Sequence, residues 1–221
     1  MSTDQLAVVH ADDALLVFDK PSGQLSVPGR GAGKADCLAA RAQARWPDAL
    51  VVHRLDMATS GLIAMARGLP AQRTLSEAFA TRRVHKRYRA LVQGVVAAEP
   101  GAWQEIDLPL IADWPNRPLQ KVDFDAGKPS CTRWRLLAAD TARRRSLLEL
   151  EPVTGRSHQL RVHLLAIGHP ILGDALYGDA AARSAAARLC LHATVLGLPH
   201  PAGGAALAFT SPAPFGPYTP Q

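Results

Sequence analysis

Residues 50–67 read LVVHRLDMATSGLIAMAR. Two apolar runs, 50–55 and 62–67, enclose a polar turn that contains Thr59, Ser60 and Gly61. Short apolar runs bounded by turn residues are typical of β-strands, so we expect two strands joined through this turn. Asp56 stands where the first strand is expected to end, and loops held by rigid strands often carry reactive groups. Asp56 is therefore a candidate functional residue, with capping of the turn as the alternative.

The rest of the chain shows the same short runs. Further strands are expected at 14–19, 88–96, 147–150, 188–197 and 206–210, and helical periodicity occurs at 34–46, 69–82 and 157–167, where Gly168 is a stop signal. Strands and helices do not alternate regularly, which disfavours a doubly wound parallel sheet. The sequence predicts an α+β fold with a mixed, mostly antiparallel sheet and flanking helices.

Length and composition predict one globular domain. The chain has 221 residues, of which 48% are hydrophobic, and its net charge is 25 − 19 = +6. We expect a single domain over 1–221, with a short N-terminal segment at 1–13 and a loosely ordered tail at 212–221. No apolar run is long enough for a membrane helix, and three distant cysteines form no CxxC pair, which favours the cytoplasm. The positive charge favours a polyanionic partner.

The basic charge is concentrated in one window. Residues 82–89 contain no acid and carry Arg82, Arg83, His85, Lys86, Arg87 and Arg89. In a strand, Lys86 and Tyr88 point to one face and Arg87 to the other. A tyrosine beside cations suits stacking on a nucleobase near a phosphate backbone. The alternative is a tyrosine half-buried at the margin of a sheet.

A second polar segment, 154–163, reads TGRSHQLRVH. Gly155 marks a turn and Ser157 is the expected N-cap of the helix that follows. Arg156 and Arg161 are charged residues beside a helix whose core side is expected to carry Leu160, Leu164 and Leu165. A buried arginine is stable only when a carboxylate meets it. These arginines therefore indicate a site, with a structural ion pair or a solvated face as the alternative.

Metal and nucleotide sites are not indicated. Residues 29–35, GRGAGKA, have the wrong glycine spacing for a phosphate loop and lack its hydroxyl residue. The sequence contains no HExxH motif, and His158 and His163 would diverge by about 140° on one helix. We expect neither a metal nor a cofactor.

Four segments together resemble the ordered signatures of the RluA family of RNA pseudouridine synthases. They are His53-Arg54-Leu55-Asp56 with Thr59-Ser60-Gly61, Lys86-x-Tyr88, residues 154–163, and Leu191-His192-Ala193. The resemblance extends from about residue 16, through 19–23 (DKPSG), to 212. Residues 113–118 and 168–174 are similar to the short members that act on both tRNA and large-subunit rRNA. The resemblance implies a pseudouridine synthase fold with a central RNA-binding cleft and no S4-type domain.

The resemblance also implies roles for individual residues. Asp56 would act at the sugar C1′ as nucleophile or base, and Arg161, rather than Arg156, would keep it ionised. Tyr88 would stack on the target uracil, and Arg54, expected on the same strand face as Asp56, would fill the space that the flipped base leaves. Contacts to RNA are expected from Arg54, Arg82, Arg83, Lys86, Arg87, Arg117, Lys121, Arg156 and His158.

The predicted activity is isomerisation of specific uridines to pseudouridine in a tRNA anticodon stem-loop and in 23S rRNA, by a monomer without a cofactor. One alternative is an enzyme of the same family that acts only on rRNA or only on tRNA. The other is a basic RNA-binding or ribosome-assembly protein without catalytic activity.

Overall fold

The computed structural model describes residues 6–29 and 35–216. Its described residues belong to two compact units: unit 1 comprises Met1–Lys86 and Ala193–Pro212, and unit 2 comprises Arg87–His192 and Ala213–Gln221. The single catalytic domain over 1–221 stays a prediction. Most of the glycine-rich segment at 29–35 and the last five residues of the tail lie outside the described residues.

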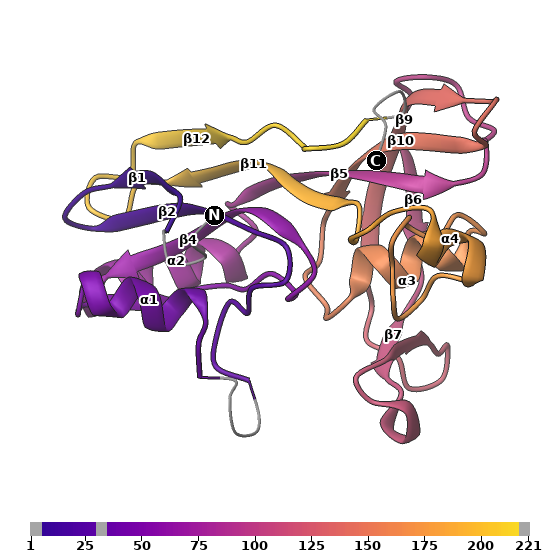
Figure 1. Ribbon diagram of the computed structural model, residues 1–221. Coiled ribbons are helices and arrows are strands. Elements are labelled where there is room, and N and C mark those ends of the chain that lie inside the picture. The colour runs from indigo at the N-terminus through magenta and orange to yellow at the C-terminus, as the bar shows by residue number, and fades with distance from the viewer. Residues whose placement is uncertain (1–5, 30–34, 217–221) are drawn as a thin grey trace. The chain divides into compact units, whose positions relative to one another are not determined.

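Unit 1 is built on a sheet of short strands (Figure 1). Its strands are β1 (Val8–Ala11), β2 (Leu15–Lys20), β3 (Ala49–Val51), β4 (Ser60–Arg67), β11 (Leu191–Pro199, in unit 1 from Ala193) and β12 (Ala206–Thr210). Their order is β1-β2-β4-β11, with β3 paired to β4 and β12 paired to β11. The β1–β2, β2–β4, β3–β4 and β11–β12 pairs are all antiparallel.

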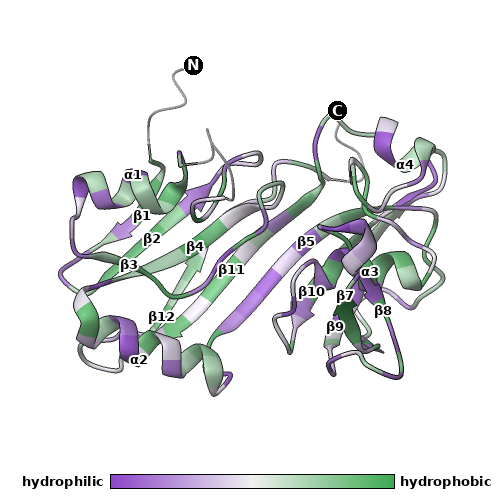
Figure 2. Cartoon of the chain, turned by 90° about the horizontal axis from the view of Figure 1, so that it is seen from below, coloured by the Kyte–Doolittle hydropathy of each residue, from purple (hydrophilic) through white to green (hydrophobic). Residues whose placement is uncertain are grey.

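Both faces of this sheet are covered. Val17 of β2 packs in a cluster with Leu75 of the helix α2 (Gly68–Ala80). Phe18, the next residue of β2, contacts Trp46, which ends the helix α1 (Leu38–Arg45), with ring centroids 5.9 Å apart. Successive residues of a strand point to opposite faces, so Val17 with Leu75 and Phe18 with Trp46 pack on opposite faces of the sheet. Burial on both faces explains why β2 and β4 are almost continuously hydrophobic (Figure 2).

The two helices of unit 1 were predicted with slightly wrong bounds. The expected helix at 34–46 begins at Leu38, because Cys37 is its N-cap and its Sγ accepts from Ala40 N at 3.3 Å. The expected helix at 69–82 ends at Ala80, because Arg82 adopts a left-handed conformation with φ of 59°. A left-handed residue after the last turn ends a helix.

Unit 2 contains four neighbouring strands and a separate hairpin. The four strands have the order β5-β10-β9-β6 and pair antiparallel throughout. They are β5 (His85–Gln93, in unit 2 from Arg87), β10 (Arg145–Pro152), β9 (Cys131–Asp140) and β6 (Gln104–Asp107). The hairpin consists of β7 (Leu110–Ala112), the 3-10 turn η1 (Trp114–Asn116) and β8 (Gln120–Val122). The predicted α+β class with a mostly antiparallel sheet is confirmed.

The helices of unit 2 are α3 (Gln159–Ala166) and α4 (Ala180–Ser184). The expected N-cap at Ser157 is wrong, because His158 occupies that position with φ of 55° and makes no side-chain cap bond. The expected core position of Leu165 is also wrong, since Leu165 is 40% exposed whereas Arg161 is 4% exposed. The helix α3 contacts β8, β9 and β10. Its residues 159–164 are all buried, whereas Leu165 in its last turn is exposed.

Most expected strands are present, but several regions differ from prediction. The expected strand at 50–55 ends at Val51, and β1, β6, β7, β8, β9 and α4 were not foreseen. The tail expected to be loosely ordered from 212 packs onto unit 2 at Phe215, which is buried and lies under the Arg188 guanidinium at 5.7 Å. No helix among the described residues is long and apolar enough to cross a membrane.

Candidate active site

Asp56 lies in the loop that joins β3 to β4. Residues 52–59 belong to no strand or helix, and Thr59 N donates to the Asp56 backbone carbonyl at 3.1 Å, which closes a turn directly after the carboxylate. The expectation that Arg54 and Asp56 share a strand face is therefore wrong, because β3 ends at Val51. Arg54 is exposed and Asp56 is partly buried.

A buried lysine donates hydrogen bonds to this loop and to the segment that follows β2. Lys20, the last residue of β2, is 0% exposed. Its Nζ donates to the carbonyls of Pro21 at 2.9 Å, Gln24 at 2.8 Å and Met57 at 3.1 Å. Three carbonyl oxygens around one ammonium use all three of its N–H donors and compensate for its loss of water. The backbone directly after Asp56 is thereby tied to the end of β2.

Two serines add further bonds to the same loop. Ser22 Oγ donates to the Ala58 carbonyl at 2.7 Å. Ser26 Oγ donates to the Leu55 carbonyl at 2.7 Å and accepts from Leu55 N at 3.1 Å. The residues on both sides of Asp56 therefore have their backbone groups bonded to the 20–26 segment. This pre-positions the carboxylate in the way that a reactive group requires.

His53 continues the pairing of β3 with β4 through its side chain. The ring Nε2 accepts from Ala64 N at 2.9 Å, and the ring stacks on Phe79 with centroids 4.5 Å apart. Burial, together with the nearby positive charge of Lys86, lowers the pKa of His53 to about 3. His53 is therefore neutral at physiological pH, as an accepting Nε2 requires.

Gly61 follows the loop and cannot be replaced without strain. Its φ is +108°, and a Cβ placed on it would lie 2.4 Å from the backbone oxygen of Ala193. The absent side chain lets β4 approach β11 closely at the point where the loop ends.

The basic window at 82–89 begins after the end of α2 and continues into β5. Arg82 and Arg83 are exposed after α2, and Arg83 Nε donates to Thr81 Oγ1 at 3.1 Å. Lys86 is partly buried, and this burial lowers the pKa of its ammonium. Tyr88 follows two residues later in β5 and is 9% exposed. The predicted alternation, with Lys86 and Tyr88 on one face, agrees with this burial pattern.

Arg87 points to the opposite face of β5, as predicted. Its Nη1 donates to Glu149 Oε2 at 2.9 Å, and its Nη2 lies 3.8 Å from Glu151. Its guanidinium also lies 5.2 Å from the ring centroid of Trp103. Two carboxylates already match this charge, so a phosphate would have to compete with them. The role of Arg87 in RNA binding stays a prediction.

Arg161 and Asp174 form a buried ion pair in unit 2. Arg161 Nε donates to Asp174 Oδ2 at 2.8 Å, and Nη2 donates to Oδ1 at 2.6 Å. Burial raises the pKa of Asp174, but the bonds from Arg161 and from the backbone N–H groups of Leu176 and Tyr177 outweigh it and lower the pKa overall. A bidentate contact fixes the plane of the guanidinium. Asp174 thus orients Arg161.

Tyr177 connects the start of α3 to the β7–β8 hairpin. Its hydroxyl lies 2.6 Å from His158 Nδ1 and accepts from Gln120 N at 2.8 Å. Its ring lies 4.9 Å from the Arg161 guanidinium. Arg156, by contrast, is exposed and donates to the Pro129 carbonyl at 3.3–3.4 Å. Of the two candidate arginines, only Arg161 is held rigidly.

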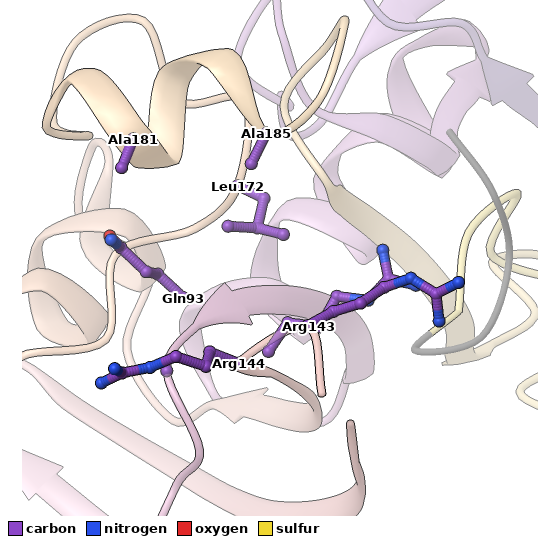
Figure 3. A pocket seen from close by; sticks show the side chains of 8 residues that line it. Gln93, Arg143, Arg144, Leu172, Ala181 and Ala185 are labelled. Atoms are coloured by element: carbon purple, nitrogen blue, oxygen red, sulfur yellow. The ribbon is translucent and has the colours of Figure 1, made fainter. Parts of the chain in front are cut away.

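A basic hollow lies elsewhere in unit 2 (Figure 3). It has a volume of about 420 Å³, and Arg143 and Arg144 lie across it from Ala181 of α4 and from Ala185, which directly follows α4. Arg145 also lines it. Asp140 pairs with Arg143 at 3.0 Å and with Arg145 at 3.6 Å, so one carboxylate offsets part of this charge. None of the sequence motifs above includes these arginines.

Comparison with known proteins identifies the family. Residues 14–166 match the family model described as RNA pseudouridylate synthase. The chain belongs to this family. It is therefore an isomerase that acts on RNA, and the resemblance to the RluA family is confirmed.

Individual relatives support the same conclusion for this pseudouridine synthase. The chain is 49% identical over 212 residues to the "Dual-specificity RNA pseudouridine synthase RluA" of Escherichia coli (strain K12), covering 95% of this chain and 94% of the relative. It is 48% identical to the protein of the same name from Salmonella typhi. Among solved structures, "Human RNA Pseudouridylate Synthase Domain Containing 1" is 28% identical, has a TM-score of 0.80, and matches over 98% of this chain and 87% of that chain.

The candidate residues of this pseudouridine synthase divide between the two units. Asp56, Arg54, Arg82, Arg83 and Lys86 belong to unit 1, and the other predicted site residues belong to unit 2. The juxtaposition of Asp56 with Tyr88 and Arg161, and the central cleft, stay predictions. Sequence reasoning assigned no role to Lys20, Asp174 or Tyr177. Lys20 and Asp174 lie in two segments quoted for the resemblance, 19–23 and 168–174. The motifs therefore included these two residues but did not indicate what they do.

Proposed function

We propose that this pseudouridine synthase converts specific uridines in a tRNA anticodon stem-loop and in 23S rRNA, with Asp56 as nucleophile or base at the sugar C1′ of a flipped uridine. The observation that carries the proposal is the Asp56 loop, whose backbone on both sides of the carboxylate is bonded to Lys20, Ser22 and Ser26. A carboxylate held in this way can attack C1′ or accept the proton whose loss permits elimination.

The reaction breaks one bond and forms another within the same nucleotide. The ribose C1′ separates from N1 of uracil, the base rotates, and C1′ joins C5, after which the proton on C5 is released and N1 takes up a proton. No heavy atom of the base leaves, so the protein's task is to retain the fragments. Tyr88, buried to 9% exposure, suits this task because an aromatic ring can stack on uracil throughout the rotation.

Arg161 is the proposed counter-ion of Asp56. An arginine that keeps a catalytic carboxylate ionised must itself be fixed, and the bidentate bond to Asp174 supplies that rigidity. Asp174 uses two of the five guanidinium N–H donors, so the opposite edge of Arg161 is the one proposed for Asp56. Arg54, exposed at the start of the same loop as Asp56, is proposed to fill the space of the flipped base.

The RNA backbone is proposed to contact basic side chains of both units. These are Arg82, Arg83, Lys86, Arg117, Lys121, Arg156 and His158, with Arg87 less favoured because of its carboxylate partners. Binding through such groups weakens steeply as salt rises, because phosphate contacts release counterions.

The double substrate class rests on the relatives named above, whose names state dual specificity. Modification of rRNA only or of tRNA only is the alternative. Pseudouridine mapping by primer extension on tRNA and 23S rRNA, in cells with and without the protein, distinguishes the three cases. We further propose that the enzyme acts as a monomer in the cytoplasm, where its three cysteines, all free thiols, stay reduced.

Asp56→Asn tests the catalytic assignment. We expect loss of turnover by at least about 1000-fold, because the amide is neither a nucleophile nor a base, with RNA affinity retained. Release of tritium from C5-labelled uridine measures turnover, and filter binding measures affinity. Asp13→Asn is the matched control, because the Asp13 side chain is fully exposed. Undiminished turnover of the Asp56 variant would favour a role as a non-catalytic RNA-binding protein.

A further inference from the structure

We propose that Trp114 is a stacking platform for an unpaired nucleobase of the substrate RNA, at a place separate from the target uridine. The Arg117 guanidinium covers one face of the indole, and the base would stack on the other face. The inference rests on the chain's action on RNA and adds a base-contacting residue that the proposed function does not contain.

The first observation is exposure. Trp114 is 67% exposed and Phe124 is 76% exposed, the highest values among the exposed large hydrophobic side chains of the described residues. A single exposed hydrophobic side chain is common on protein surfaces and by itself indicates nothing. Trp114 differs from Phe124 in its partner, since the Arg117 guanidinium carbon lies 3.0 Å from the centroid of the Trp114 ring. One face of the indole is thereby covered, and the high exposure belongs to the other face and the edges.

The second observation is the rigidity of the turn that carries the stack. None of residues 114–116 is buried, so packing does not hold Trp114 in place. Hydrogen bonds within the turn do so instead. They are Asn116 N to Asp113 O at 3.0 Å, Leu119 N to Asn116 O at 3.0 Å, Asp113 N to Leu119 O at 2.9 Å, and Asn116 Nδ2 to Asp113 Oδ2 at 2.9 Å. Pro115 and Pro118 further restrict the backbone. The indole is presented outward by a preformed turn, which reduces the entropy lost on binding.

The third observation is the connection of this turn to the proposed catalytic residues of unit 2. Gln120 N, at the start of β8, donates to the Tyr177 hydroxyl at 2.8 Å. Tyr177 lies beside His158 and Arg161, as described above. The platform therefore has a fixed position relative to Arg161. A base stacked on Trp114 would hold its neighbouring nucleotides in register with that arginine.

The chemistry of the stack favours a nucleobase over an apolar protein surface. An indole with a cation on one face offers its other face to a planar π-system, and every base has such a face. Arg117 and Lys121 on the same hairpin supply charge for the adjoining phosphates, although Lys121 also lies 3.3 Å from Asp123. Trp114 and Phe124 are separated by nine residues that include several charged ones, so they form no continuous apolar sequence.

The affinity experiment compares Trp114→Ala with Phe124→Ala in the full chain, using a synthetic tRNA anticodon stem-loop. We expect Trp114→Ala to raise the dissociation constant about 10-fold, which is typical of a lost base stack, without changing the slope of log K against log salt. Trp114→Phe should recover most of the affinity. An effect of Phe124→Ala as large as that of Trp114→Ala would overturn the specific role of the indole–guanidinium stack.

A spectroscopic experiment separates this inference from the choice of substrate. Oligouridylate should quench tryptophan fluorescence, inorganic polyphosphate should quench it far less, and Trp114→Phe should remove the quenching by oligouridylate. Quenching that persists in Trp114→Phe, or unchanged affinity in Trp114→Ala, overturns the inference even if pseudouridine is formed. A wild-type dimer that Trp114→Ala dissociates also overturns it. Failure of the wild type to modify either RNA contradicts the proposed substrates and leaves the oligouridylate result to decide on Trp114.

Discussion

Arg161 and Asp174 are joined by two hydrogen bonds of 2.8 and 2.6 Å, and their side chains are 4% and 1% exposed. The pair is thirteen residues apart in sequence and connects α3 to the segment before α4. Its burial means that neither partner can be removed without leaving an uncompensated charge or donor. The pair thus serves both the stability of unit 2 and the proposed orientation of Arg161.

Asp174→Ala should destabilise the protein by about 3–5 kcal/mol, because it leaves the Arg161 guanidinium buried without its carboxylate. Urea unfolding followed by circular dichroism measures this change. Arg83→Ala is the control, since the Arg83–Glu77 pair is 3.5 Å long with both side chains at least half exposed. That variant should stay within about 1 kcal/mol of the wild type. Equal stability of the two variants would contradict a structural role for the buried pair.

Lys20→Met should lower both stability and turnover. The methionine fills a similar volume but leaves the carbonyls of Pro21, Gln24 and Met57 without their ammonium donor. We expect a loss of about 3 kcal/mol or more, since the variant loses three hydrogen bonds from a charged donor, each of which contributes about 1.5–3 kcal/mol. The turnover number should fall more than the Michaelis constant rises, because the displaced loop carries Asp56. A variant with normal turnover at saturating RNA would show that Lys20 does not position Asp56.

Gly61→Ala should be strongly destabilising for two independent reasons. The new Cβ would lie 2.4 Å from the Ala193 oxygen, and the φ of +108° is unfavourable for alanine. We expect a loss of more than about 2 kcal/mol, measured as a decrease in the urea midpoint. Gly203→Ala is the matched control, because a Cβ at Gly203 would meet nothing within 4 Å. A midpoint for Gly61→Ala equal to that of the control would disprove the close approach of β4 and β11.

The depressed pKa of His53 predicts acid sensitivity. Its folded pKa of about 3 lies below the usual histidine pKa of 6.5, so the folded state favours the neutral ring. The resulting stability is fully present above about pH 6.5 and is lost progressively as the pH falls from there towards 3. His53→Gln, which keeps an acceptor for Ala64 N, should reduce the slope of unfolding free energy against pH between 7 and 5. An unchanged slope would mean that His53 is not the titrating group.

The sequence was informative about local elements and about which residues matter. Period-two and period-3.6 patterns placed β2, β4, β5, β10, β11 and β12 to within three residues, and the three longer helices to within four. They missed β1, β6, β7 and β8, because strands of three or four residues are too short to show a period, and they also missed the ten-residue strand β9. The motif around Asp56 pointed to a functional loop, although the strand before that loop ends earlier than the apolar run does.

By itself, then, the sequence determined the α+β class, the family and the candidate catalytic residues, because these depend on periodicity and on motifs read along the chain. Only the tertiary structure decided the partners of those residues. That Lys20 binds the Met57 carbonyl, that Arg161 binds Asp174, and that Arg87 binds Glu149 all depend on contacts between residues distant in sequence. Such contacts follow from the need of buried charges for compensating groups, and no local pattern states which group will be near.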